Sequence, residues 1–126
     1  MKSLKEFELD IIKYQLLSAH GLIELLSGMK YANGCGANGG IKFPKTMYGV
    51  NIESACIIHD IEWQLSSNLN DLIEANHRFN KNLKKICDSE SSNKVMAWLR
   101  RMRIAKYVAG VELHGLDTYA MKRDFY

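Results

Sequence analysis

The chain has 126 residues, of which 47% are apolar and 25% are charged, and its formal net charge is +3. This length and composition predict one globular domain, residues 1–126, with a core of its own. The small net charge gives little support for a nucleic-acid binder. The sequence contains no run of about 18 apolar residues, so no membrane span is predicted. No apolar segment typical of a secretory signal follows the charged N-terminus.

Apolar periodicity predicts four helices. The first covers residues 3–27 and ends at Gly28, with one apolar stripe along it. The stripe consists of Leu4, Phe7, Ile11, Leu16, Ala19, Ile23 and Leu26. A loop of about 20 residues, 31–51, follows, and loops of that length in compact domains are often functional.

The second helix is expected to begin after Asn51, acting as its N-cap, and to end near Ser66. The third covers residues 70–87, and the fourth begins at Ser91 or Ser92, runs to Leu113 and is closed by Gly115. The side chains expected on the buried side of the fourth helix are Val95, Trp98, Leu99, Met102, Ala105, Tyr107 and Val108.

A basic run in the fourth helix comprises Arg100, Arg101, Arg103 and Lys106. A solvated helix face is the default interpretation of this run. A contact with an anionic membrane comes second, and nucleic acid comes last.

The most informative stretch places Cys56, His59, Asp60 and Trp63 at helical spacing on one face of the second helix. A histidine can move protons near neutral pH, and a neighbouring carboxylate can hold a hard cation. The plainer interpretation is a hydrogen-bonded core histidine beside a surface aspartate.

Asn76 lies on the apolar face of the third helix, where a buried polar side chain needs a partner. A short connection predicts that the second and third helices pack antiparallel, which brings Asn76 toward His59. Its carboxamide oxygen is then expected to accept from Nδ1–H of the imidazole. The alternative is that Asn76 bonds to backbone or water.

Four glycines lie within residues 34–40, upstream of the His-Asp helix. Alone they predict only a tight turn. Together with the long loop and Asp60 they favour a cation-binding loop, because hard cations take carbonyl and carboxylate oxygens. The three cysteines allow at most one intramolecular pair, with Cys87 expected to be left over.

At these residues the chain resembles the phospholipase A2 superfamily, in its short bacterial and bacteriophage forms, over about residues 31–115. A cysteine-glycine loop followed by Cys-x-x-His-Asp is the specific part of the resemblance. The segments that carry it are 33–36 with Gly39 and Gly40, Pro44, 55–63, 75–83 and 107–115.

The resemblance implies an all-α fold in which two antiparallel long helices carry the His-Asp site, with a glycine-rich calcium loop and flanking terminal helices. It implies a calcium-dependent ester hydrolase releasing fatty acid from a phospholipid membrane, with His59 as general base. The location would be a bacterial cytoplasm or a phage virion. Calcium would be held by Asp60 and by carbonyls of Gly34, Gly36 and Asn38. Gly36 would also supply an oxyanion donor, and Cys35 would pair with Cys56 in an oxidising setting.

Two residues depart from the family pattern. Asn76 stands where the family usually has aspartate, and Trp63 stands where it usually has tyrosine. An asparagine can orient the imidazole but carries no charge to stabilise its protonated form. These departures support an alternative, a catalytically silent relative acting as a phage structural or host-interaction protein.

A third class is a helical metal phosphohydrolase, which would bind a transition metal through His20, His59 and Asp60. This class has only one His-Asp pair in its favour, and the chain is short for its architecture. Otherwise His20 and His77 are expected to be ordinary surface or core polar residues.

Overall fold

The computed structural model describes residues 2–32 and 45–125, except for the side chains of Tyr31 and of 114–125. The described residues form a mostly helical fold, which confirms the all-α class. The helices are α1 (Leu4–Tyr14), α2 (Leu22–Gly28), α3 (Glu53–Leu65), α4 (Leu69–Glu90) and α5 (Lys94–Phe125). A short 3-10 turn (Met29–Tyr31) follows α2, and strands β1 (Thr46–Met47) and β2 (Val50–Asn51) pair antiparallel just before α3.

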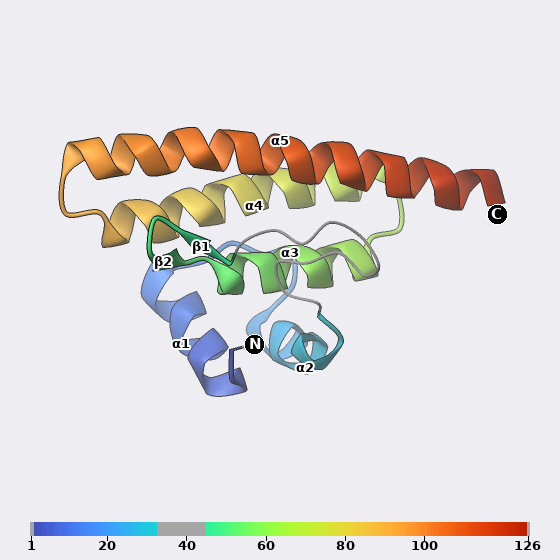
Figure 1. The fold of residues 1–126 in the computed structure, drawn as a ribbon. Coiled ribbons are helices and arrows are strands. Elements are labelled where there is room, and N and C mark those ends of the chain that lie inside the picture. Colours follow the sequence, from blue (N-terminus) through green and yellow to red (C-terminus); the bar gives the residue numbers. More distant parts are fainter. Residues whose placement is uncertain (1, 33–44, 126) are drawn as a thin grey trace.

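The helices α3, α4 and α5 run back and forth beside one another. Figure 1 shows α4 returning along α3 and α5 returning along α4, with α1 and α2 on the other side of α3. The connections are short, residues 66–68 and 91–93. The expected antiparallel packing of the His-Asp helix against the next helix is therefore confirmed.

The predicted first helix is wrong in its middle, because it breaks into α1 and α2. Gln15 adopts a left-handed conformation (φ 52°) and ends α1. Beyond it, the side chain of buried Asn82 accepts from the N–H of Leu17 at 2.7 Å and donates to the carbonyl of Leu17 at 2.8 Å. A tertiary contact thus takes up the backbone groups that a continuous helix would have paired internally.

The ends of the later helices differ from the predictions by a few residues. The side chain of Asn68 accepts from the N–H of Asp71 and begins α4, while that of Asn93 accepts from the N–H of Met96 and begins α5. Gly115 does not end α5, which continues to Phe125. A glycine inside a helix costs only about 1 kcal/mol relative to alanine, which is too little to impose an end by itself.

The core lies around α3, which is buried on most of its circumference. Ile57, Ile58 and Ile61 are at most 2% exposed. The face of α4 predicted to be apolar is also buried, at Leu72, Phe79, Leu83 and Ile86. Among the described residues, no helix is both long and apolar enough to cross a membrane.

The predicted buried side of α5 is wrong in part. Tyr107 and Val108 are buried as expected, but Val95, Trp98 and Met102 are 67%, 59% and 50% exposed. Arg100, assigned to a solvated face, is instead 8% exposed. It donates to the carbonyl of Tyr48 at 2.9 Å and to Oγ of Ser91 at 2.7 Å, two contacts that draw this side of α5 inward.

Candidate functional site

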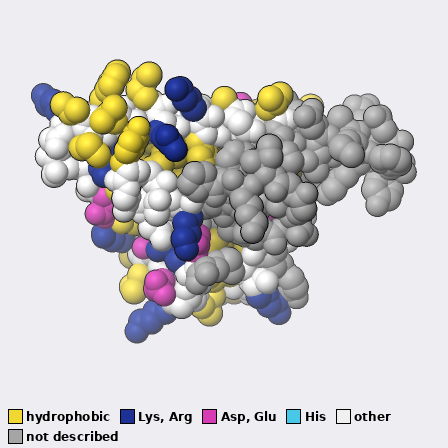
Figure 2. Space-filling model, viewed as in Figure 1, with side chains coloured by type: hydrophobic (Ala, Val, Ile, Leu, Met, Phe, Trp, Pro, Cys, Tyr) yellow, Lys and Arg dark blue, Asp and Glu magenta, His cyan; other side chains and the backbone are white. Residues whose placement is uncertain are grey.

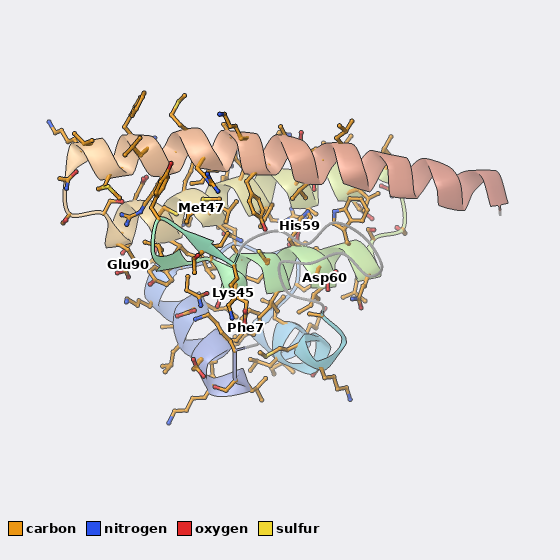
Figure 3. All side chains as sticks on the ribbon, in the orientation of Figure 1. Phe7, Lys45, Met47, His59, Asp60 and Glu90 are labelled. Carbon is orange, nitrogen blue, oxygen red and sulfur yellow. The ribbon has the colours of Figure 1, made fainter. Side chains whose placement is uncertain are left out.

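The predicted His-Asp stripe begins one turn into α3. The N-cap position is Ile52, whose side chain cannot hydrogen-bond, and Asn51 takes over by accepting from the N–H of Glu53 at 2.8 Å. Along the helix, Cys56 is buried, whereas His59 and Trp63 are partly buried. Figure 3 shows His59 and Asp60 as neighbours on α3.

His59 and Asn76 meet as the sequence predicted. The imidazole Nε2 lies 2.6 Å from Oδ1 of Asn76, across the contact between α3 and α4. The indole N–H of Trp63 donates to the same oxygen at 3.3 Å. One carboxamide oxygen therefore joins both rings of α3 to α4, and the expectation that Asn76 bonds to backbone or water in place of His59 is not met.

The nitrogen that bonds to Asn76 differs from the prediction. Trp63 can only donate, so the Asn76 atom that it contacts must be the carboxamide oxygen, which only accepts. His59 must then carry its proton on Nε2, not on Nδ1 as expected. Nδ1 keeps its lone pair, and no contact among the described residues uses it.

Aromatic rings enclose the imidazole. The Phe79 ring stacks on it at a centroid distance of 4.5 Å and an interplanar angle of 26°, and the Trp63 ring is tilted at 5.9 Å. The Tyr107 ring of α5 packs against Phe79 at a centroid distance of 5.9 Å, and its hydroxyl lies 3.7 Å from Sγ of Cys56. Burial raises the pKa of the Tyr107 phenol, so it stays protonated at physiological pH.

Burial also sets the proton affinity of the imidazole. It lowers the pKa of His59 from 6.5 to about 4, and the hydrogen bond to Asn76 acts in the opposite direction without restoring it. Among the described residues, no charged group opposes the burial effect at the imidazole. The ring is thus neutral at pH 7, with a lone pair able to accept a proton but a weak hold on that proton once taken.

Asp60 is partly buried, and Nε2 of Gln64 donates to its Oδ2 at 3.4 Å. Its predicted calcium partners, Gly34, Gly36 and Asn38, lie outside the described residues, as does the predicted oxyanion donor Gly36. A carboxylate next to a histidine along the helix fits the oxygen-rich ligand set that calcium prefers. The calcium site stays a prediction.

The described cysteines differ in their bonding: one is a free thiol and the other is in a disulfide. Cys87 is a buried free thiol, as expected for the residue left over. Burial raises its pKa to about 11, which makes it unreactive near neutral pH. Cys56 is disulfide-bonded. Its predicted partner, Cys35, lies outside the described residues.

A buried ion pair that the sequence analysis missed holds the two helices in register. Glu62 is 3% exposed, and Nε of Arg78 donates to both its oxygens, at 2.8 and 3.1 Å. Oε1 of Glu62 also accepts from the N–H of Ala19 at 2.9 Å. Glu62 follows His59 by three residues and Arg78 follows Asn76 by two, so the ion pair fixes the alignment of the His59 contact. The available signal was an acid between two large apolar residues, Ile61 and Trp63.

The transition-metal alternative is not supported. His20 faces Glu24, with Nδ1 to Oε2 at 3.0 Å. Among the side chains that the structure describes, no group of three His, Cys, Asp or Glu lies close enough to hold a metal ion. The predicted set of His20, His59 and Asp60 does not come together. His77 is exposed on α4, as expected for a surface residue.

No protein-family model, curated protein or solved structure matches the chain. An assignment of function therefore depends on the motif residues and on the geometry around His59.

Proposed function

We propose that the protein is a phospholipase A2-like hydrolase that uses calcium to cleave the sn-2 ester of phospholipids. The observation that carries the proposal is the hydrogen bond between Nε2 of His59 and Oδ1 of Asn76. With the proton on Nε2, Nδ1 keeps its lone pair, and Asp60 is the next residue along α3. Trp63 adds a second bond to the same oxygen and limits how far Asn76 can turn. This arrangement suits a general base whose tautomer is fixed by its partner.

The proposed reaction uses His59 to take a proton from a water at Nδ1 while that water attacks the ester carbonyl. Asn76 keeps the imidazole oriented, and the packing of Phe79 against the ring keeps bulk water off that side. After the ester bond breaks, the proton passes from His59 to the leaving alkoxide oxygen. Calcium, when bound by Asp60 and the carbonyls of Gly34, Gly36 and Asn38, supplies polarisation of the ester carbonyl.

Asn76 sets the expected rate. Because it has no charge, it does not stabilise the imidazolium formed in the reaction electrostatically, and burial lowers the pKa of His59 to about 4 despite the hydrogen bond to Asn76. In a serine-protease triad the replacement of aspartate by asparagine lowers the rate by about 10⁴-fold. We therefore propose a slow enzyme, in which Asn76→Asp raises turnover by at least about tenfold, within that upper limit.

The test is release of fatty acid from phospholipid vesicles at millimolar calcium. We expect release by the wild type, none with a chelator, and none by His59→Ala. His77→Ala is the matched control, because His77 is the exposed neighbour of Asn76 on α4 and does not contact His59. Absence of release by both the wild type and Asn76→Asp would contradict the proposal.

The second candidate is a catalytically silent relative acting through a protein partner of a phage or its host. The low pKa of His59 and the uncharged Asn76 favour it, because both weaken a general base. It predicts no calcium binding by calorimetry and specific retrieval of one partner that is unaffected by His59→Ala.

A further inference from the structure

The side of α5 that faces away from the rest of the molecule carries a second apolar stripe. Its large members, Val95, Trp98, Met102 and Leu113, are 50% to 67% exposed, and the exposed Ala105 and Ala109 lie between them. The spacing of three and four residues places all six on one helix face. This face, called the outer face below, is opposite Ile104, which is fully buried.

The borders of the outer face are basic. Residues 94–111 contain five Lys or Arg and no Asp or Glu, and the four exposed ones are Lys94, Arg101, Arg103 and Lys106. Arg101 forms an ion pair with Asp88 of α4, so the positive charge of the borders comes mainly from the other three. Figure 2 shows hydrophobic side chains gathered over the first half of α5 with Lys and Arg among them. The first acid beyond this stretch is Glu112, at its far end.

We propose that the outer face binds the surface of an anionic lipid membrane. A helix with apolar and aromatic side chains on one face and Lys or Arg beside them lies in the headgroup region, with its apolar side in the acyl boundary. Trp98 suits that position because an indole has an apolar body and a polar edge. Each basic residue near the surface adds attraction to anionic headgroups.

Tyr48 extends the same surface beyond the helix. The hairpin turn between β1 and β2 brings its ring, 48% exposed, to 5.7 Å from the guanidinium of Arg103. Arg100 fixes the turn to α5 through the carbonyl of Tyr48. An aromatic ring and a basic residue thus lie together at the border of the outer face. Both residue types bind favourably in the headgroup region of an anionic membrane.

A second copy of the chain fits this face less well. At 1.5 Å per residue, the stripe from Val95 to Leu113 is roughly 27 Å long, and one helix face of that length covers a few hundred Å². Stable interfaces bury roughly 800 Å² on each partner. Two copies would also bring their basic borders together, which is unfavourable, whereas an anionic membrane neutralises them.

The proposed function also requires contact with a phospholipid membrane. The biological role of the membrane binding inferred here rests on that function. The binding itself does not involve the His-Asp site, since the residues of the outer face are exposed and lie opposite the fully buried Ile104 on α5. Membrane binding and ester hydrolysis can therefore be measured separately.

The test is co-sedimentation of the full chain with vesicles of phosphatidylcholine containing phosphatidylglycerol, with pure phosphatidylcholine vesicles as the comparison. A chelator is present throughout, so that hydrolysis does not contribute. We expect preferential binding to the anionic vesicles, weakened roughly tenfold by Trp98→Ala with Met102→Ala. Lys106→Glu should weaken it by roughly fivefold or more, and added salt should do the same.

The matched controls remove equivalent groups elsewhere. Ile23→Ala removes an 80% exposed side chain of α2, and Lys81→Glu reverses an exposed charge of α4, so both should leave binding unchanged. Lack of wild-type binding, or equal loss in the controls, would overturn the proposal. A wild-type dimer that Trp98→Ala converts to a monomer, without vesicle binding, would assign the outer face to a second copy. Vesicle binding here, together with no fatty-acid release by the wild type or by Asn76→Asp in the separate assay at millimolar calcium, would contradict the proposed function alone.

Discussion

The contact between α3 and α4 and the outer face of α5 depart from the usual distribution of side chains in opposite ways. The first places Asn76 and Glu62, both polar, in the interior, where each is bonded to residues of the facing helix. The second leaves Trp98 and Met102 largely exposed to solvent. A buried polar group is stable only when it is hydrogen-bonded or ion-paired. An exposed apolar stripe is typical of a surface that binds another molecule.

The difference shows where the fold is already complete. At the α3–α4 contact, the polar groups are satisfied inside the molecule, and the contact fixes register and ring orientation. On α5, one apolar face is packed and the other is not. Four predictions test this contrast, beginning with the largest effect.

The largest contrast should be between two aromatic residues. Phe79→Ala removes a ring that is 2% exposed and contacts both His59 and Tyr107, so it should lower the free energy of unfolding by about 3–5 kcal/mol. Trp98→Ala, at 59% exposure, should lower it by less than about 1 kcal/mol. Urea denaturation followed by circular dichroism measures both. Equal losses would mean that Trp98 belongs to the core after all.

Glu62→Ala should be the next most damaging change. It leaves the Arg78 guanidinium and the Ala19 N–H without their acceptor, so we expect a loss of about 2–4 kcal/mol in the free energy of unfolding. Glu74→Ala is the control, because Glu74 faces Arg78 at 3.8 Å but is 57% exposed. It should cost less than about 0.5 kcal/mol. A small effect of Glu62→Ala would show that α3 and α4 do not need this pair to stay in register.

The imidazole of His59, which packs against Phe79 and Trp63, should make stability depend on pH. The folded pKa of His59, about 4, lies below the unfolded value of 6.5, so between these values the unfolded chain binds more protons. Its contribution is therefore complete above pH 6.5 and decreases as the pH falls toward 4, by up to about 3 kcal/mol. The difference between wild type and His59→Phe in urea denaturation across this range isolates the effect. A difference that does not change with pH would show that His59 is not buried as described.

Asn76→Asp should change proton affinity more than stability. An adjacent carboxylate stabilises the imidazolium, so the pKa of His59 should rise from about 4 by about 1–3 units. An NMR titration of the imidazole protons measures this shift directly. His77→Asp, which introduces the same charge at the exposed neighbouring position, should move the pKa of His59 by less than about 0.5 unit because solvent and salt screen it. Equal shifts in the two variants would contradict a direct His59–Asn76 contact.

The His59–Asn76 contact was more predictable than the outline of the fold. The spacing of His59, the position of Asn76 on an apolar helix face and the short connection at residues 66–68 together predicted the contact that the structure shows. The protonated nitrogen was predicted wrongly, because it depends on how the imidazole turns between Phe79 and Trp63. The Glu62–Arg78 pair was missed because its two members are 16 residues apart, and a separation of that length is not a local sequence signal.

The sequence by itself determined that the chain is helical, that α3 presents His59 beside Asp60, and that Cys87 is left unpaired. These features follow from local spacing and capping. Only the tertiary structure decided that the first helix ends at Gln15, because the side chain of Asn82, on α4, hydrogen-bonds to the backbone of Leu17. It also decided which of two apolar faces of α5 packs inward. Periodicity marks both faces as apolar, and the contacts of Arg100, Ile104 and Tyr107 select one of them.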